Sequence, residues 1–125
     1  MIKLVFAIRR REGLSEAEFR RYWREDHAAL VTRHAEALRI RRYVQTHTVE
    51  QTLGERLADA RGSITGRYDG LAELWWDSLQ EMVEASLSIA GERASLELIA
   101  DERRFIDLSA SAIWMGEENP VIAGR

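Results

Sequence analysis

The sequence contains no cysteine and only one proline among its 125 residues. The absence of cysteine excludes disulfides, thiol nucleophiles and cysteine-ligated metal centres. No apolar run is long enough to span a membrane. The apolar N-terminus leads directly into Arg9, Arg10 and Arg11, which reverses the charge order of a signal peptide. We therefore expect a cytoplasmic protein without a membrane segment.

An excess of positive charge is also missing, since 21 acidic residues outnumber 18 basic ones and the two signs are interspersed. This balance argues against nucleic-acid binding. Glycine-rich phosphate loops of the G-x-G-x-x-G and Walker A types are absent, so we expect no nucleotide cofactor. What is present is a hydrophobic fraction of 46%, which suits one globular domain over residues 1–125.

The hydrophobic pattern predicts the element order β-α-β-β-α-β, which is the ferredoxin-like plan of an α+β protein. Alternating apolar residues predict strands over 2–9, 41–49, 71–76 and 108–115. The first helix follows Ser15, which can form a capping box with Glu18, and runs into the 30s. The second helix is capped by Asp77 or Ser78, with Glu81 completing a second S-x-x-E box, and is broken or bent at Gly91.

Both faces of the predicted sheet carry apolar side chains. The strand over 71–76 places Leu71 and Trp75 on one face and places Ala72, Leu74 and Trp76 on the other. Both helices of this plan cover the same face, so the second face needs another cover. We expect a second copy of the chain to supply it, which gives a homodimer and a dimeric α+β barrel. The alternative cover is the tail or the connection over 50–70, whose length is typical of a lid or a disordered segment.

Two histidines fall within the apolar stripe of the first predicted helix. At about 100° per residue from Phe19, Trp23 lies near 40°, His34 near 60° and His27 near 80°, with Asp26 at the stripe's edge. An imidazole in this position is suited to acid–base chemistry, to metal binding or to a hydrogen-bonded place in the core. Seven residues, or about 10 Å of helix, separate the two histidines, so we expect no shared metal ion. Nothing in the sequence favours a haem bound by His27.

Side chains from other elements are expected to line the same cleft. The candidate ligand-binding residues are Trp23 and His34 from the first helix, Tyr43 from the second strand and Phe6 from the first strand. Tyr43 shares its strand face with Gln45 and His47, by alternation. Polar residues of this kind are more often structural strand-edge residues than ligand-binding ones.

The segment over 19–28 resembles the F-x-x-Y-W-x-x-x-H-A signature of EthD-like proteins, and the segments over 42–45, 68–75 and 105–108 resemble later parts of that family. The resemblance implies a dimeric α+β barrel in which Trp23 and His27 occupy the motif positions. The family is named after a protein associated with an oxidative ether-degradation system, and its fungal relatives resemble dehydratases or decarboxylases of aromatic polyketides. In related barrels, small hydrophobic compounds bind between helices and sheet.

Two functional hypotheses follow. In the first, the protein binds a small hydrophobic metabolite, either aromatic, polyketide-like or ether-derived, in the helix–sheet cleft. His27 then acts as acid or base in a cofactor-free dehydration, cyclisation or isomerisation, and Asp26 or a strand hydroxyl orients its imidazole. In the second, the protein is a non-catalytic accessory or binding module of an oxidative degradation pathway. RNA binding on the same topology is disfavoured, because the segment over 70–76 lacks the aromatic and basic pattern that it needs.

Overall fold

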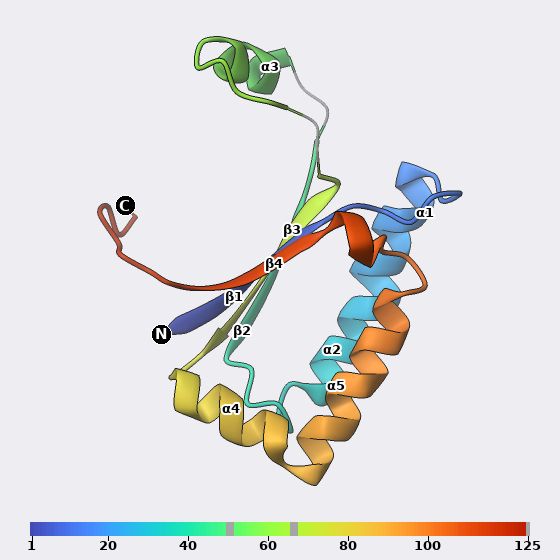
Figure 1. The fold of residues 1–125 in the computed structure, drawn as a ribbon, viewed down its shortest axis with the longest axis vertical. Coiled ribbons are helices and arrows are strands. Elements are labelled where there is room, and N and C mark those ends of the chain that lie inside the picture. The colour runs from blue at the N-terminus through green and yellow to red at the C-terminus, as the bar shows by residue number, and fades with distance from the viewer. Residues whose placement is uncertain (50–51, 66–67, 125) are drawn as a thin grey trace.

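Four strands form one antiparallel sheet, and the long helices cover one of its faces (Figure 1). The computed structural model describes residues 1–49, 52–65 and 68–124. The elements in chain order are β1 (Ile2–Ile8), α1 (Glu16–Arg21), the π-helix η1 (Tyr22–His27), α2 (Ala28–His34), β2 (Arg42–His47), α3 (Thr52–Asp59), β3 (Gly70–Trp76), α4 (Leu79–Leu87), α5 (Ile89–Glu102), the 3₁₀-helix η2 (Leu108–Ala110) and β4 (Ala112–Glu117). None of the helices within these ranges is long and apolar enough to cross a membrane.

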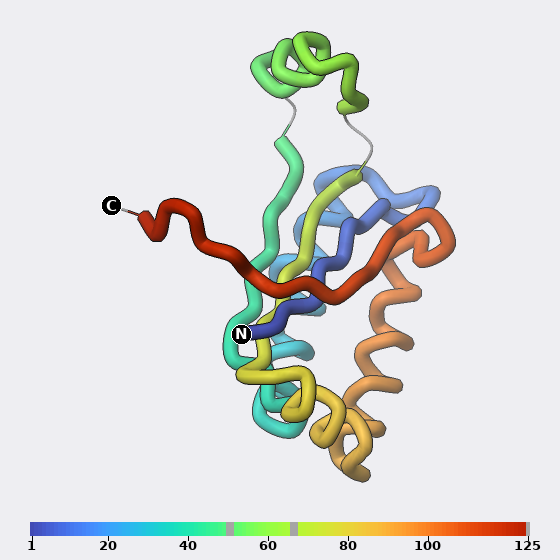
Figure 2. The backbone as a smooth tube through the Cα atoms, turned by 60° about the vertical axis from the view of Figure 1, so that its left-hand side comes forward, coloured from blue at the N-terminus to red at the C-terminus, as the bar shows by residue number. Residues whose placement is uncertain are grey.

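The strand order is β2-β3-β1-β4, and every neighbouring pair is antiparallel. The two connections between outer and inner strands carry α2 and α5 to the same face, where they lie side by side (Figures 1 and 2). This is the ferredoxin-like arrangement, so the predicted α+β fold class is confirmed. The largest fully buried side chains of the core are Ile8, Phe19, Trp23 and Phe105.

The helix that follows β1 contains a widened turn. Its four buried residues, Phe19, Trp23, His27 and Val31, are each four residues apart. In a regular α-helix this spacing drifts by roughly 40° a step and by roughly 120° over the whole set. The π-helical turn, in which the Ala28 N–H reaches the Trp23 carbonyl five residues back, removes most of that drift. All four side chains can therefore face the interior in one row.

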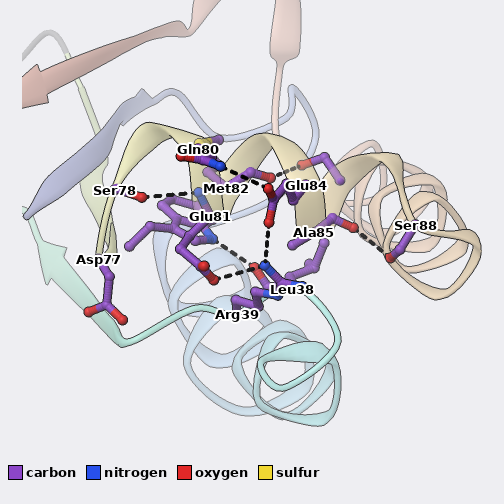
Figure 3. A network of polar contacts seen from close by, with 12 residues as sticks. Leu38, Arg39, Asp77, Ser78, Gln80, Glu81, Met82, Glu84, Ala85 and Ser88 are labelled. Carbon is purple, nitrogen blue, oxygen red and sulfur yellow. Dashed lines mark hydrogen bonds and ion pairs between the residues drawn. The ribbon is translucent and has the colours of Figure 1, made fainter.

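A single residue, Ser88, separates α4 from α5. Its hydroxyl donates to the Ala85 carbonyl (Figure 3) and accepts from the Gly91 N–H, so it closes one helix and caps the next. The predicted break at Gly91 therefore lies three residues too late. Gly91 is needed for a different reason, because a Cβ atom there would lie 1.7 Å from the Ala85 carbonyl oxygen.

Both predicted helix caps are present, but only the first capping box is complete. Ser15 and Glu18 bond reciprocally. At the second site the Ser78 hydroxyl accepts from the Glu81 N–H at 3.1 Å, whereas the Glu81 carboxylate accepts from the Arg39 guanidinium at 2.8 Å (Figure 3). Arg39 has a φ of 57°, in the left-handed region that ends a helix. This ion pair joins the end of the first helical segment to the start of α4.

The last strand begins later than the alternation predicts. Residues 108–110 form the 3₁₀-helix η2, and β4 spans Ala112–Glu117. The Ser109 hydroxyl donates to the Asp107 carboxylate, and the Ser111 hydroxyl donates to the Asp107 carbonyl, each at 2.7 Å. Such local side-chain bonds compete with the strand ladder, which explains the shorter strand.

The connection between β2 and β3 contains α3, which lies away from the rest of the chain (Figure 2). Thr52–Asp59 is helical, although Leu53 and Leu57 are both exposed. Residues 50, 51, 66 and 67 of this predicted lid or disordered segment lie outside the described residues.

The second face of the sheet is open, since no helix of the described ranges lies over it (Figure 1). Its side chains include Val5, Trp75 and Trp114, which lie on the face opposite to the helices. Trp75 is buried beneath the side chains of Lys3 and Arg42, whose cationic groups lie 5.2 and 4.6 Å from its ring centre. Trp114 is 51% exposed.

Candidate active site

A cavity of about 230 Å³ lies between the sheet and the helices. Most of its wall is aliphatic or aromatic and comes from all four strands or their flanks and from η1, α2, α4 and α5. The polar side chains that line it, among the described residues, are His27, Tyr43, Ser86, Ser95 and Glu102. A mostly apolar cavity with a few polar groups is the usual form of a small-molecule site.

His27 is the buried imidazole of this wall. It is 5% exposed, and its Nδ1 lies 2.7 Å from Oδ2 of Asp101 on α5. A carboxylate can only accept, so this contact assigns the proton of a neutral ring to Nδ1 and leaves the lone pair on Nε2. Burial lowers the pKa of His27, and the hydrogen bond to Asp101 only partly offsets that effect. The ring is therefore neutral at pH 7, with Nε2 able to accept a proton.

Asp101 is itself held in place by several neighbours. Its other oxygen accepts a hydrogen bond from the Tyr22 hydroxyl and lies 3.9 Å from Nε of Arg104. Phe105 packs between these groups, with its ring centre 4.9 Å from that of His27 and 5.1 Å from that of Tyr22. These contacts fix the carboxylate, and the carboxylate fixes the orientation of the imidazole.

Glu102 is the acidic group of the cavity wall. Burial raises its pKa to about 7, the nearby Asp101 charge adds to the increase, and Arg103 opposes it. At neutral pH a substantial fraction of the Glu102 side chain is therefore a protonated acid that can donate. The pocket thus holds a potential base and a potential acid.

A hydrogen-bonded cluster of polar side chains on β2 lies next to η1, the helix that carries His27. Gln45 Nε2 donates to the Trp23 carbonyl at 2.9 Å and to the Tyr43 hydroxyl at 2.8 Å. The Gln45 side-chain oxygen lies 2.8 Å from Nε2 of His47, whose ring stacks on Trp23 at 4.4 Å. Gly70 allows this packing, since a Cβ there would lie 2.4 Å from the Trp23 ring.

A family model described as the EthD domain matches residues 11–109 of the chain. The chain belongs to the EthD family. The matched region includes His27, Tyr43, Asp101 and Glu102, so all the polar groups described above lie within the EthD domain. A search of curated proteins finds no match to this chain.

Solved structures of low sequence identity share this fold. An ethyl tert-butyl ether d (EthD) family protein from Bacillus halodurans is 19% identical with a TM-score of 0.63, covering 95% of this chain and 99% of that one. An EthD-like protein from Ralstonia eutropha is 15% identical with a TM-score of 0.62, covering 98% and 94%. A Deinococcus radiodurans protein provisionally named as an antibiotic biosynthesis monooxygenase is 13% identical with a TM-score of 0.54, covering 100% and 99%.

The structure places four of the predicted EthD site residues at the cavity, namely Phe6, Trp23, His27 and Tyr43. His34 is not among the lining residues. Its Nε2 lies 2.8 Å from a Glu97 carboxylate oxygen, so it forms an ion pair between α2 and α5. The prediction that His34 binds substrate is therefore wrong. The physical reason is the π-helical turn, which sets α2 back by roughly 100° relative to a regular α-helix.

The prediction that Asp26 orients His27 is also wrong, because side chains one position apart on a helix do not face each other. Asp26 lies on the outer side of η1 and its carboxylate is 3.4 Å from Arg21, whereas Asp101 bonds the imidazole. Neither Asp101 nor Glu102 is among the residues predicted from the sequence. One signal was available, because Glu102 follows Leu98 by four residues on the apolar face of its helix.

Proposed function

We propose that this EthD protein binds a small, largely apolar metabolite in the cavity and that His27 transfers a proton during its conversion. One observation supports this most directly: His27 bonds Asp101 at 2.7 Å while it lines a mostly apolar cavity. The volume of about 230 Å³ exceeds the ~150 Å³ of an engineered cavity that binds benzene, so one or two rings fit. Aromatic or polyketide-like compounds have this size and polarity.

The chemistry follows from the protonation of the two groups. Nε2 of His27 takes a proton from a carbon next to a carbonyl group, the C–H bond breaks, and its electron pair forms an enolate. The protonated imidazole shares a short hydrogen bond with Asp101, which stabilises its charge. The proton then returns to carbon, or Glu102 gives its own proton to a leaving hydroxyl group, which departs as water. Isomerisation, cyclisation and dehydration all begin with this abstraction, and none of these steps needs an added cofactor.

The test begins with a native mass spectrum of the protein purified from its own host, which identifies any retained compound. We expect the wild type to convert that compound and His27→Ala to convert it at least about 10²-fold more slowly. Asp101→Asn should lower the rate as well, because an amide supports the wrong tautomer. Asp26→Asn is the matched control and should leave the rate unchanged, since Asp26 bonds Arg21 on the surface. Equal rates for His27→Ala and wild type would contradict the catalytic role.

Retention without turnover in every variant would instead support an accessory binding module of an oxidative pathway. In that case addition of a partner oxygenase should change the fate of the bound compound. The two outcomes differ in whether chemistry occurs in the purified protein alone.

A further inference from the structure

The Tyr43 hydroxyl belongs to a hydrogen-bond network whose geometry assigns every proton. We infer that Gln45 is a positioning residue that holds the Tyr43 hydroxyl as a donor toward the cavity, so that the site selects ligands with an acceptor oxygen. Ketones, quinones and esters carry such an oxygen. The inference rests on the proposed function in one respect, namely that the cavity binds a small apolar molecule.

The Trp23 carbonyl determines how the Gln45 side-chain amide is oriented. This carbonyl already accepts from the Ala28 N–H within the π-helical turn and also faces Gln45. A carbonyl oxygen can only accept, so the Gln45 group at 2.9 Å must be the amide nitrogen rather than the oxygen. The orientation of the Gln45 amide is therefore fixed by the backbone of η1.

Once the amide is fixed, its two other partners are fixed as well. The second Gln45 N–H donates to the Tyr43 oxygen at 2.8 Å. The Gln45 oxygen accepts from Nε2 of His47 at 2.8 Å, so the proton of that ring is on Nε2. Both amide protons and the amide oxygen are thus engaged.

The Tyr43 hydroxyl has one proton and two lone pairs. Its oxygen receives the Gln45 N–H, and the nearby Trp23 side chain, whose one polar group is the indole N–H, can only donate. Neither neighbour can accept the hydroxyl proton, and the hydroxyl forms no hydrogen bond as a donor among the residues that the structure describes. Because Tyr43 lines the cavity, its proton is available to a ligand. Burial raises the pKa of Tyr43, the Gln45 and Trp23 N–H groups oppose the increase and the Glu102 charge adds to it, so the proton stays in place at neutral pH.

The experiment compares two probes of matched shape, 2-acetylnaphthalene and 2-isopropenylnaphthalene, which differ in having C=O or C=CH₂. Affinities are measured at about pH 8.5, where Glu102, with its pKa of about 7, no longer donates. We expect the ratio of ketone to alkene affinity to fall about tenfold in Tyr43→Phe. Gln45→Glu should lower the ratio similarly although Tyr43 is intact, because the new carboxylate accepts the hydroxyl proton and turns it from the cavity.

A second readout is the infrared band of the bound ketone carbonyl. We expect it at lower wavenumber in the wild type than in either variant, since a hydrogen bond weakens the C=O bond. Thr46→Val is the matched control, because Thr46 lies on the opposite face of β2 and should change neither readout. A purely structural role for Gln45 would lower the affinity for both probes equally and leave their ratio unchanged.

Two results would overturn the inference, and they differ in what else they affect. If both probes bind with the same ratio and the same carbonyl band in all variants, the inference fails while the proposed binding site stands. If neither probe binds the wild type, the inference fails together with the proposed apolar site. If Gln45→Glu does not fold, Tyr43→Phe still decides whether the hydroxyl donates.

Discussion

Burial shifts the pKa values of two titratable side chains of the cavity in opposite directions. Burial lowers the pKa of His27, a base, and raises the pKa of Glu102, an acid, to about 7. In both cases the low-polarity surroundings favour the neutral form. At pH 7 the cavity therefore carries less charge than ordinary pKa values would give it, which favours the entry of an apolar ligand while leaving one acceptor and one donor for chemistry.

Glu102 should make the stability of the protein depend on pH. Its carboxyl group holds a proton more tightly in the folded than in the unfolded state, so its stabilising effect is full below about pH 4.5 and falls as the pH rises through about 7. Between pH 5 and 8 we expect the wild type to lose about 2–3 kcal/mol of unfolding free energy relative to Glu102→Gln. Urea unfolding of both proteins at both pH values measures the difference. A constant difference across this range would show that Glu102 titrates normally.

The positions of site residues were predictable from sequence only in part. His27 and Trp23 come before most of the accumulated drift, so a regular helical phase places them correctly. His34 lies after the π-helical turn and was misplaced, because no residue type marks such a turn in a sequence. Asp101 lies 74 positions from His27, and a bond at that separation depends on tertiary packing that periodicity does not contain.

At the scale of elements, the corner between α4 and α5 consists of one residue. Ser88 alone closes α4 and caps α5, which brings the Gly91 backbone directly against the Ala85 carbonyl. Helix starts were predictable because Ser15 and Ser78 bond to their own neighbours in sequence. The corner itself was misplaced because a serine that caps helices on both sides gives no stronger signal than the nearby glycine.

Gly91→Ala should destabilise the protein by about 1–3 kcal/mol or more, since the added methyl group has no room beside the Ala85 carbonyl. Thermal unfolding measures the effect. Gly54→Ala is the matched control, because Gly54 is also helical and a Cβ there meets nothing within 4 Å. That control should be neutral or stabilising by up to about 1 kcal/mol. Equal effects of the two changes would show that the corner can open without loss.

At the scale of the whole molecule, no helix of residues 1–49, 52–65 and 68–124 covers one face of the sheet, which presents Trp114 to solvent. The C-terminal segment leaves the sheet beyond β4 and exposes Val121 and Ile122 (Figure 2). Exposed apolar groups around an open sheet face favour association with a second copy. We therefore keep the homodimer as a prediction, and the single chain already contains the complete His27–Asp101 pair.

Trp114→Glu should convert a dimer into a folded monomer, because it places a charge at the centre of the contact that we expect. Sedimentation equilibrium gives the mass, and circular dichroism checks the fold. Leu87→Glu is the control, since Leu87 is 78% exposed on α4 and lies on the helical side of the sheet. A wild type that sediments as a monomer at micromolar concentration would contradict the prediction.

The π-helical turn also has a consequence for inheritance. A π-helical turn corresponds to one residue, and so one codon, inserted into an otherwise regular helix. The segment over 22–27 should therefore tolerate many substitutions but few insertions or deletions. Deleting one residue there would rotate the preceding helix by roughly 100° and withdraw the Trp23 carbonyl from Gln45. One lost codon would thereby disturb the row of buried side chains and the network on β2 together.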